Sequence, residues 1–390
     1  MPKKSKKKLR VFIDGTVLVI PHFSGIGHYV AALLKEVDSL LFEEEFAHIS
    51  IEIGVPFRLR HNIGRFGFEN FAIRKMYVTD RITNGLKKRN LTPPLDLFYG
   101  RKLYLFPNYS GWRLLFSKSI PFIYDASFIL FPHFSDDNNR IFLTLQTQLS
   151  ADRSSRIVAI SQNAKNEIVE YFSTDDKKID VIYPILDTNK FYRRSDNEVA
   201  NVKAKYGIFG DYIVFVGNLE PRKNLVSLLK AYDDLDPKLQ KKFSLLLIGA
   251  KGWKDEEITD LILDMRKRGV RVIQPIEYVH DNDLPALLTG ATALCYVSVY
   301  EGFGIPPTEA MACGTPCISA FNSSLPEAVG EAALTVEALD IAGITKAIEK
   351  ILTDEKLRAR LIDAGYKQIE KFNSRDIAVQ FLRSLELGVK

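Results

Sequence analysis

Two carboxylates, Glu301 and Glu309, flank a glycine- and proline-rich turn in the segment YEGFGIPPTEAMACGTPCISAFNSSLPE, residues 300 to 327. Glycines let the backbone approach a ligand closely, and paired prolines fix φ where a helix begins. Glu301 is therefore expected in the turn and Glu309 in the first helical turn, beside a row of free backbone N–H groups. Carboxylates accept hydrogen bonds from hydroxyls, and free N–H groups bind anions. The pattern predicts a ligand with both hydroxyls and phosphates, such as a nucleotide sugar.

A second segment whose residues could bind a ligand is IVFVGNLEPRKNLVSLLKAY. A strand is expected to end at Gly217 and Asn218, and a helix to begin at Asn224. Arg222 and Lys223 stand at that helix start, where the positive end of the helix dipole disfavours cations. Two cations in this position predict a bound anion.

A third segment, SGIGHY, lies between the first expected strand and the first expected helix. Gly25, Ile26 and Gly27 are expected to bring backbone N–H groups close to a phosphate. The same letters begin the Gly-x-Gly-x-x-Gly fingerprint of dinucleotide-binding proteins, so an NAD-dependent oxidoreductase is an alternative. Val30 occupies the third glycine position of that fingerprint, which would prevent the close helix-strand packing it requires.

The composition is that of a large globular enzyme. At 390 residues the chain exceeds what one hydrophobic core usually serves, so two domains are expected. No apolar run approaches the roughly 20 residues that span a bilayer, and no apolar signal segment stands at the start, so a cytoplasmic protein is expected. Cys295, Cys313 and Cys317 are odd in number and lack metal-ligand spacing, so we expect small buried hydrophobic residues rather than disulfide partners.

Apolar runs of strand length alternate with helical patterns, which predicts an α/β protein whose parallel sheets are covered by helices on both faces. One series contains the runs LRVFIDG, PFIYDA and RIVAIS, with a helix expected over VAALLKEVDSLL. The other contains YIVFVGN, FSLLLIGA, VRVIQP, ATALCYVS, TPCISA and AALTVE. A polar stretch with Pro184 separates the two series, so the linker is expected near residues 184 to 198.

The segment 300 to 327 resembles the signature of the family 4 glycosyltransferases of GT-B fold, including the spacing of its two glutamates. The other matching residues are Tyr300, Gly302, Phe303, Gly304, Pro306, Ala310, Met311, Gly314, Pro316, Pro326 and Glu327. The resemblance implies that Glu301 contacts the donor sugar and Glu309 the donor ribose, while Arg222 and Lys223 grip the donor diphosphate. It also implies donor contacts at Gly25, Ile26, Gly27, Gly217, Asn218, Tyr278, Val279, Gly302, Phe303, Gly304 and Ile305.

The same resemblance implies two Rossmann-like domains that face each other across a cleft. Residues 1–190 would form the acceptor-side domain, with a basic tail at 1–8, and residues 198–371 the donor-binding domain. The C-terminal helix, within residues 372–390, is expected to cross back to the first domain.

Transfer in the resembled family retains the anomeric configuration, and the protein chiefly stabilises the departing diphosphate. Arg222 and Lys223 would supply this charge without a metal or other cofactor. Two Asp-x-Asp strings, at 234–236 and 281–283, are interpreted as helix-end or capping positions rather than metal ligands. Relatives commonly carry a His-Asp pair where this chain has Tyr124 and Asp125, which are the remaining catalytic candidates. A tyrosine does not carry a proton at neutral pH unaided, because its ordinary pKa is near 10.

The strings SGIGHY, IGAKGW and YVHDNDLPALL look most like bacterial mannosyltransferases, which implies a GDP-mannose donor, with UDP-sugars as the alternative. The expected activity is hexose transfer to a saccharide or lipid-linked acceptor in surface polysaccharide synthesis. An inactive scaffold or sensor that binds a nucleotide sugar is the alternative class.

Basic residues gather between residues 56 and 102, where eleven Lys or Arg stand against three acidic residues and are interleaved with seven aromatic residues. Such a region can hold a protein on anionic lipid headgroups, line an acceptor pocket, or fold into an ordinary core. Peripheral contact with the inner face of the plasma membrane is therefore one expectation. Nucleic acid is not an expected partner, because no recognised binding module accompanies the charge.

Overall fold

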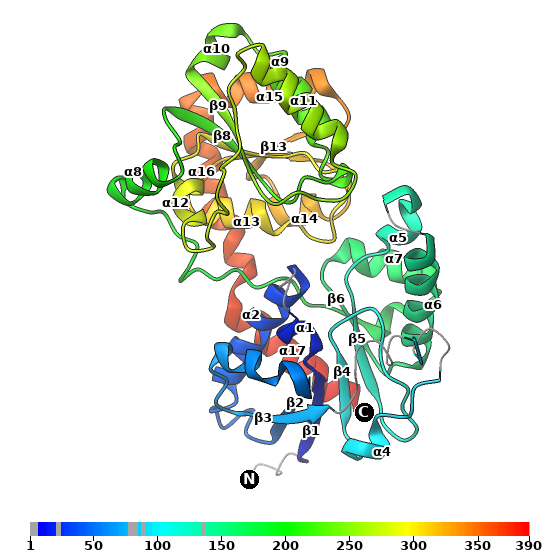
Figure 1. Cartoon of the computed structure of the whole chain (residues 1–390). Helices are drawn as coiled ribbons and strands as arrows, with labels where there is room; N and C mark the ends of the chain where they lie inside the picture. The colour runs from blue at the N-terminus through cyan, green and yellow to red at the C-terminus, as the bar shows by residue number, and fades with distance from the viewer. Residues whose placement is uncertain (1–6, 21–24, 77–84, 87–90, 135–136, 390) are drawn as a thin grey trace. The chain divides into compact units, whose positions relative to one another are not determined.

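The computed structural model describes residues 7–20, 25–76, 85–86, 91–134 and 137–389. Residues 1–6 of the basic tail, Ser24 before the glycine loop, and 77–84 and 87–90 of the basic region lie outside the described residues. The chain divides into two compact units, Met1–Ile185 with Asn373–Lys390, and Leu186–Phe372 (Figure 1). Each unit contains one sheet.

The first unit is built on a seven-stranded parallel sheet with the order β3-β2-β1-β4-β5-β6-β7. Its strands are β1 (Leu9–Asp14), β2 (Ile49–Pro56), β3 (Phe71–Met76), β4 (Leu103–Phe106), β5 (Ser119–Ile123), β6 (Ile157–Ala159) and β7 (Ile179–Val181). The strand order reverses between β1 and β4, as in a doubly wound fold. Val11, Phe12 and Ile13 of β1 are fully buried, which places this strand at the centre of the core.

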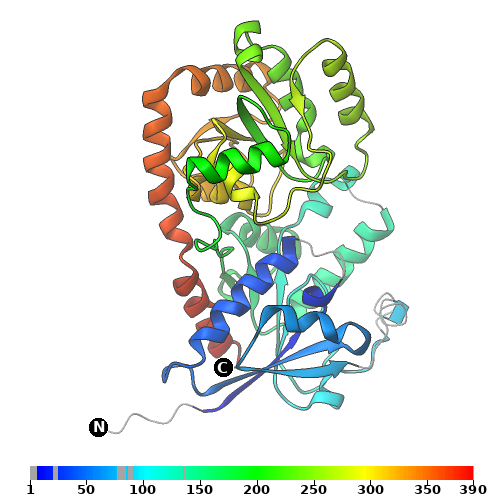
Figure 2. The same cartoon turned by 60° about the vertical axis from the view of Figure 1, so that its left-hand side comes forward.

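The helices of the first unit include the last helix of the chain. They are α1 (Thr16–Val19), α2 (Gly25–Leu40), α4 (Asp96–Tyr99), α5 (Ser127–Leu130), α6 (Asp137–Arg153), α7 (Gln162–Phe172) and α17 (Ser374–Gly388), with 3-10 turns at Phe57–Phe66, Pro132–Phe134 and Asp176–Lys178. Figures 1 and 2 both show α17, in red, beside the blue helix α2. Phe381 of α17 is fully buried against Phe122 of β5, so the C-terminal helix belongs to the core of the first unit.

The second unit is built on a six-stranded parallel sheet with the order β10-β9-β8-β11-β12-β13. Its strands are β8 (Asp211–Val216), β9 (Phe243–Ile248), β10 (Val272–Ile273), β11 (Ala293–Tyr296), β12 (Cys317–Ala320) and β13 (Ala333–Val336). The order reverses between β8 and β11, which pair through Ala293 with Ile213 and Leu294 with Val214.

The helices of the second unit follow its strands in alternation. They are α8 (Asp196–Lys205), α9 (Leu225–Asp233), α10 (Pro237–Lys242), α11 (Glu256–Lys267), α12 (Leu284–Thr289), α13 (Ile305–Ala312), α14 (Leu325–Val329), α15 (Ile341–Thr353) and α16 (Glu355–Ile369), with 3-10 turns at Pro221–Lys223 and Glu370–Phe372. Amphipathic α15 packs against α9, and α13 against α16. The three cysteines are free and buried, as predicted.

The predicted α/β class with parallel sheets is confirmed, and each predicted apolar run contains a strand. The sequence analysis did not identify β2, β3, β4 or β7. The pattern of β3 explains one omission, because its four central residues are exposed and only its ends are buried. The run VRVIQP yields only the two-residue strand β10, which lies at the edge of its sheet.

Candidate functional site

The second unit brings the residues of two loops together where its strand order reverses. Arg222 and Lys223 follow β8, and Glu301 follows β11, the neighbouring strand. In open α/β sheets, ligands bind beyond the carboxyl ends of the strands at such a reversal. The topology of the sheet therefore explains why residues so distant in the sequence form one cluster.

Glu301 is the centre of a buried ion cluster. Its Oε2 accepts from Nη1 of Arg222 at 2.8 Å, and its Oε1 accepts from Nζ of Lys223 at 2.7 Å. Nη2 of Arg222 also pairs with Oε1 of Glu220 at 3.0 Å. The side chain of Glu301 is only 8% exposed. Two cations and two carboxylates thus balance one another within the cluster.

The electrostatics of this cluster favour the charged forms of Glu301 and Arg222. Burial raises the pKa of Glu301, but Lys223 and Arg222 outweigh this effect and lower it to about 2. Burial lowers the pKa of Arg222, but Glu301 and Glu220 outweigh it, so this pKa lies above its ordinary value. Burial lowers the pKa of Lys223, although the nearby carboxylate of Glu301 acts to raise it. At neutral pH Glu301 is a carboxylate held between two cations.

Tyr296 completes the cluster, and the sequence analysis did not identify it. Its hydroxyl accepts from Nζ of Lys223 at 2.8 Å and donates to Oε1 of Glu301 at 2.9 Å. Burial and then Glu301 raise the pKa of Tyr296, so the hydroxyl keeps its proton. Its place as the last residue of β11 is a signal that could have revealed it, because strand carboxyl ends face the ligand in this kind of sheet.

The backbone around the cluster is fixed by side chains of neighbouring loops. Asn224 caps α9 with a left-handed φ of 57°, and its amide donates to the carbonyl oxygens of Val297 and Ala338. The N–H of Glu301 donates to Oγ of Ser323 at 3.0 Å, and Oγ of Ser324 donates to the carbonyl of Glu301 at 2.8 Å. These hydrogen bonds fix the loops after β8 and β11 relative to their neighbours.

The turn after Glu301 has the predicted glycine and proline chemistry, with one difference. Gly304 has φ of 102°, and a Cβ there would lie 2.6 Å from Leu325. Helix α13 begins at Ile305, but Pro306 and Pro307 have no N–H group. The row of free backbone N–H groups expected beside the two carboxylates therefore does not include these two residues. Gly314, with φ of 74°, follows the end of the helix, and its N–H donates to the carbonyl of Met311.

Glu309 was expected in the first helical turn but lies in the second turn of α13. The proline pair occupies the first turn, which explains the shift. No hydrogen bond to its half-buried carboxylate is found among the described residues. Burial raises the pKa of Glu309 to about 7, and Asp281 adds to this while Lys190 opposes it. When Glu309 is ionised, its carboxylate can accept hydrogen bonds from a ligand.

The loops that surround these groups include the other predicted donor contacts of this unit. Gly217 follows β8 and has a φ of 150°. Its carbonyl oxygen would lie 1.9 Å from a Cβ atom added at Gly249, so the two backbones are in contact. Asn218 follows it, and its carbonyl accepts from the N–H of Glu220 at 3.0 Å. Gly302 and Phe303 form the turn, where Phe303 packs edge-on against Phe372.

Tyr278 and Val279 lie in the loop between β10 and α12. Tyr278 is 71% exposed, and its hydroxyl reaches Asp281 at 3.4 Å. The same Asp281 influences the pKa of Glu309, so this loop and α13 face a common region. The exposed ring of Tyr278 gives this region an aromatic surface.

In the first unit, Gly25, Ile26 and Gly27 form the first turn of α2. A Cβ at Gly25 would meet no atom within 4 Å, so nothing in the described structure requires glycine there. The residue leaves backbone accessible at the start of a 16-residue helix, where free N–H groups favour anions.

Tyr124 and Asp125 follow β5 in the first unit, and both are already engaged. Tyr124 is 4% exposed, and its hydroxyl donates to the carbonyl of Pro107 at 3.1 Å. Burial raises its pKa well above the ordinary value. Oδ1 of Asp125 accepts from the hydroxyls of Tyr109 and Ser127 at 3.1 and 2.7 Å. This placement favours a structural role for Tyr124 over a catalytic one.

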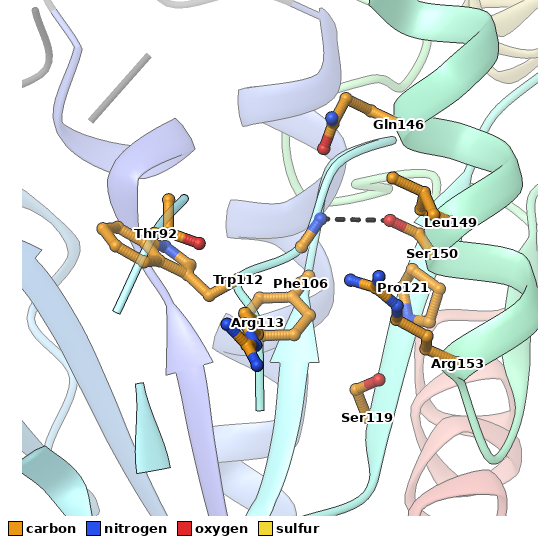
Figure 3. Close-up of a pocket in the computed structure, with 11 residues that line it drawn as sticks. Thr92, Phe106, Trp112, Arg113, Ser119, Pro121, Gln146, Leu149, Ser150 and Arg153 are labelled. Atoms are coloured by element: carbon orange, nitrogen blue, oxygen red, sulfur yellow. Dashed lines mark hydrogen bonds between the residues drawn. The ribbon is translucent and has the colours of Figure 1, made fainter. Parts of the chain in front are cut away.

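A small cavity of about 30 Å³ lies in the first unit, between the sheet and α6 (Figure 3). Figure 3 shows Gln146, Ser150 and Arg153 of α6 facing Trp112 and Phe106, with the N–H of Gly111 bonded to Oγ of Ser150 at 3.2 Å. This volume holds on the order of two water molecules. It is too small for a nucleotide sugar, so the cavity is not the candidate donor site.

Two further properties of the part of the chain that the structure describes concern metal ions and membranes. No three His, Cys, Asp or Glu side chains there form a group that could hold a metal ion. Asp236 caps α10 by accepting from the N–H of Lys238 at 2.7 Å, as predicted. Asp283 stands at the predicted helix-end position, the N-cap of α12, but its side chain accepts from Lys205 and Tyr206 instead of from a backbone N–H of that helix. Among the described helices, none is both long and apolar enough to cross a membrane.

Comparison with known proteins shows which proteins this chain resembles. The family model of glycosyl transferases group 1 matches residues 201–368, which lie within the second unit. The chain is 30% identical over 293 residues to O-antigen chain mannosyltransferase B of Escherichia coli, covering 74% of this chain and 75% of that protein. It is 30% identical over 242 residues to the serotype-specific mannosyltransferase WbdA of Escherichia coli, covering 60% of this chain but 29% of that protein.

The fold is similar to that of Anabaena HepE in complex with UDP and glucose. The TM-score is 0.70 with 17% identity, over 97% of this chain and 99% of the other. At this identity the likeness shows the fold alone, which is GT-B. The identity shared with mannosyltransferase B shows the family. The chain is therefore a GT-B hexosyltransferase that belongs to the glycosyltransferase group 1 family.

Proposed function

We propose that this glycosyltransferase moves mannose from GDP-mannose to a saccharide or lipid-linked acceptor during assembly of a cell-surface polysaccharide such as O-antigen. The observation that carries the proposal is the similarity to O-antigen chain mannosyltransferase B, which spans three quarters of both chains. The ion cluster of Glu301 at the strand-order reversal supports it, because it provides cations for a diphosphate and carboxylates for hydroxyls. UDP-sugars are the alternative donors.

The donor diphosphate is assigned to Arg222 and Lys223. In the described structure Nη1 of Arg222 donates to the carbonyl of Tyr300 and to Glu301, and Nη2 donates to Glu220. The Nε proton and the second Nη2 proton remain as donors for a ligand. Lys223 donates to Tyr296 and Glu301, which leaves one of its three protons. These remaining donors can meet phosphate oxygens while Glu301 keeps both cations in place. Hydrogen bonds from these donors would then stabilise the leaving diphosphate without a metal ion.

The sugar and ribose hydroxyls are assigned to the two glutamates. Glu301 would orient hydroxyls of the mannosyl group, and Glu309, which has no hydrogen-bond partner among the described residues, would accept from the ribose. In the transfer step, the acceptor oxygen bonds to the anomeric carbon as the bond to the diphosphate oxygen breaks. The acceptor proton passes to the departing diphosphate on the same face, so the configuration is retained.

A second candidate function is a nucleotide-sugar-binding protein without transfer activity. The placement of Tyr124 favours it, because a buried hydroxyl bonded to Pro107 stands where relatives commonly have a histidine. This class predicts donor binding with no turnover for any acceptor. Both classes are assigned to the cytoplasm, with peripheral contact at the inner face of the plasma membrane.

Calorimetry with a panel of GDP-mannose, GDP, UDP-glucose and UDP tests the proposal. We expect GDP-mannose to bind and Arg222→Ala and Lys223→Ala each to weaken binding by tenfold or more, since a charge-assisted hydrogen bond contributes about 1.5 to 3 kcal/mol. Lys346→Ala, an exposed lysine on α15, serves as the control and should bind as the wild type. Failure of all four compounds to bind would refute the proposal.

A further inference from the structure

Two short segments of the first unit expose large apolar side chains. Leu97 and Phe98 of α4 are 58% and 68% exposed, and Leu115 and Phe116, just before β5, are 49% and 65% exposed. Single exposed apolar residues are common, but a group of them marks an interaction surface.

Asp96 joins these two segments. Its buried carboxylate accepts hydrogen bonds from three successive N–H groups, those of Leu115 at 3.0 Å, Phe116 at 2.7 Å and Ser117 at 3.0 Å. The N–H of Leu95 also donates to the carbonyl of Arg113 at 2.9 Å. The four apolar side chains therefore stand on two segments that are bonded to each other.

The rim of this surface is positive. Asp96 is the only acidic residue between positions 91 and 119, and its charge is directed to backbone N–H groups. Arg101, Arg113 and Lys118 are exposed, and their side chains have no ion-pair partner among the described residues. Only Lys102 in this stretch pairs with a carboxylate, Glu52 at 2.6 Å.

The surface lies at the amino ends of the strands. Arg101 precedes β4 and Lys118 precedes β5, and these strands pair in parallel from Tyr104 with Ser119. Figure 1 shows α4 at the lower end of the first unit, beyond the start of β4 and β5. Ligands of open α/β sheets bind at the opposite, carboxyl ends. The surface is therefore separate from the edge of this sheet that a substrate would use.

We propose that these residues form a docking surface for anionic lipid, which we call the apolar-basic patch: Leu97, Phe98, Leu115 and Phe116, with Arg101, Arg113 and Lys118 at its rim. The apolar side chains enter the headgroup region while the cations meet lipid phosphates. A second copy of the chain fits less well, because a symmetric contact would bring the same unpaired cations together.

Vesicle flotation of the full chain tests this proposal, with phosphatidylcholine vesicles and with vesicles of phosphatidylcholine and phosphatidylglycerol in equal amounts. Two double variants change the patch: Phe98→Ser with Phe116→Ser, and Arg113→Glu with Lys118→Glu. Two matched controls lie in the second unit: Phe209→Ser with Leu339→Ser, which are 71% and 70% exposed, and Lys346→Glu with Lys356→Glu, which are exposed lysines. Circular dichroism and thermal unfolding establish that each variant folds.

We expect the wild type to bind the anionic vesicles and to be released by salt. The charge variant should bind about twentyfold or more weakly, because each cation near an anionic surface contributes about fivefold. The apolar variant should bind about tenfold more weakly, and both controls as the wild type. Equal binding to both vesicle types, unchanged binding by folded patch variants, or a dimer in light scattering that the patch variants abolish would overturn the proposal.

Discussion

Nζ of Lys223 lies 2.7 Å from Oε1 of Glu301, although the two residues are 78 positions apart in the chain. The contact joins the loop after β8 to the loop after β11, at the reversal of strand order. This ion pair contributes both to the fold of the second unit and to its candidate donor site. It stabilises the two loops, and it positions their charged side chains.

The first prediction concerns the stability that Glu301 provides. Glu301→Gln keeps the shape of the side chain but leaves Lys223 buried without its counter-ion, so the free energy of unfolding should fall by about 3 to 5 kcal/mol. Urea unfolding at neutral pH measures this change. The control is Glu337→Gln, an exposed residue whose replacement should change stability by less than about 0.5 kcal/mol. Equal stability of the two variants would show that the cluster does not stabilise the fold.

The pH dependence of this contribution follows from the lowered pKa of Glu301. Its folded pKa is about 2 and its ordinary value is 4.5. The stabilisation is therefore fully present above about pH 4.5 and is lost as the pH falls through 2. Linkage gives a total of about 3 kcal/mol. The difference in unfolding free energy between wild type and Glu301→Gln should shrink from pH 4.5 downward, and a constant difference across this range would contradict the lowered pKa.

Glu309 should have the opposite pH dependence. Its folded pKa is about 7 and its ordinary value is 4.5, because burial disfavours the carboxylate. The protonated form favours the folded state, so this contribution is fully present below about pH 4.5 and is lost as the pH rises through 7. Unfolding measured from pH 4 to 8 should therefore show a decline that Glu309→Gln removes and Glu337→Gln does not.

Proton release tests whether Glu309 contacts the ribose. Hydroxyls that donate to its carboxylate would favour the charged form and lower its pKa. Binding of GDP near pH 6 should then release a fraction of a proton, which calorimetry in buffers of different ionisation enthalpy detects. Glu309→Gln should lose most of this release while GDP still binds. If the variant releases as many protons as the wild type, the group that titrates is another one.

Tyr124→Phe separates a structural role from a catalytic one. The change removes the hydrogen bond to the carbonyl of Pro107 inside the core, so the free energy of unfolding should fall by about 1 kcal/mol or somewhat more. The turnover number should change less than twofold, because the hydroxyl is buried and its hydrogen bond goes to the backbone. A loss of turnover beyond tenfold without a change in stability would assign Tyr124 to catalysis.

The sequence predicted the parts of this structure that local pattern determines. Apolar runs located the central strands, and the pair Pro306 and Pro307 marked the start of α13, since proline fixes a helical φ and needs no N–H there. The resemblance predicted that Glu301, Lys223 and Arg222 contact one donor, and the structure brings these residues together, but their direct ion pairs were not predicted.

Other features depend on contacts that a single sequence does not contain. Tyr296 joins the cluster because β11 ends beside β8, a pairing between segments about 80 residues apart. The burial of Tyr124 depends on Tyr29, Phe122 and Tyr109 packing around it. The place of Glu309 in the second turn depends on where α13 starts, and helix ends are the least certain part of any sequence-based prediction.

The most direct test of the account is product analysis with GDP-mannose and lipid-linked saccharide acceptors. The account predicts that the wild type releases GDP and forms a mannoside with the α configuration of the donor, as proton NMR reports, and that Arg222→Ala and Glu301→Ala lower this rate at least a hundredfold. Binding of GDP-mannose without transfer to any acceptor, or a product of β configuration, would contradict it.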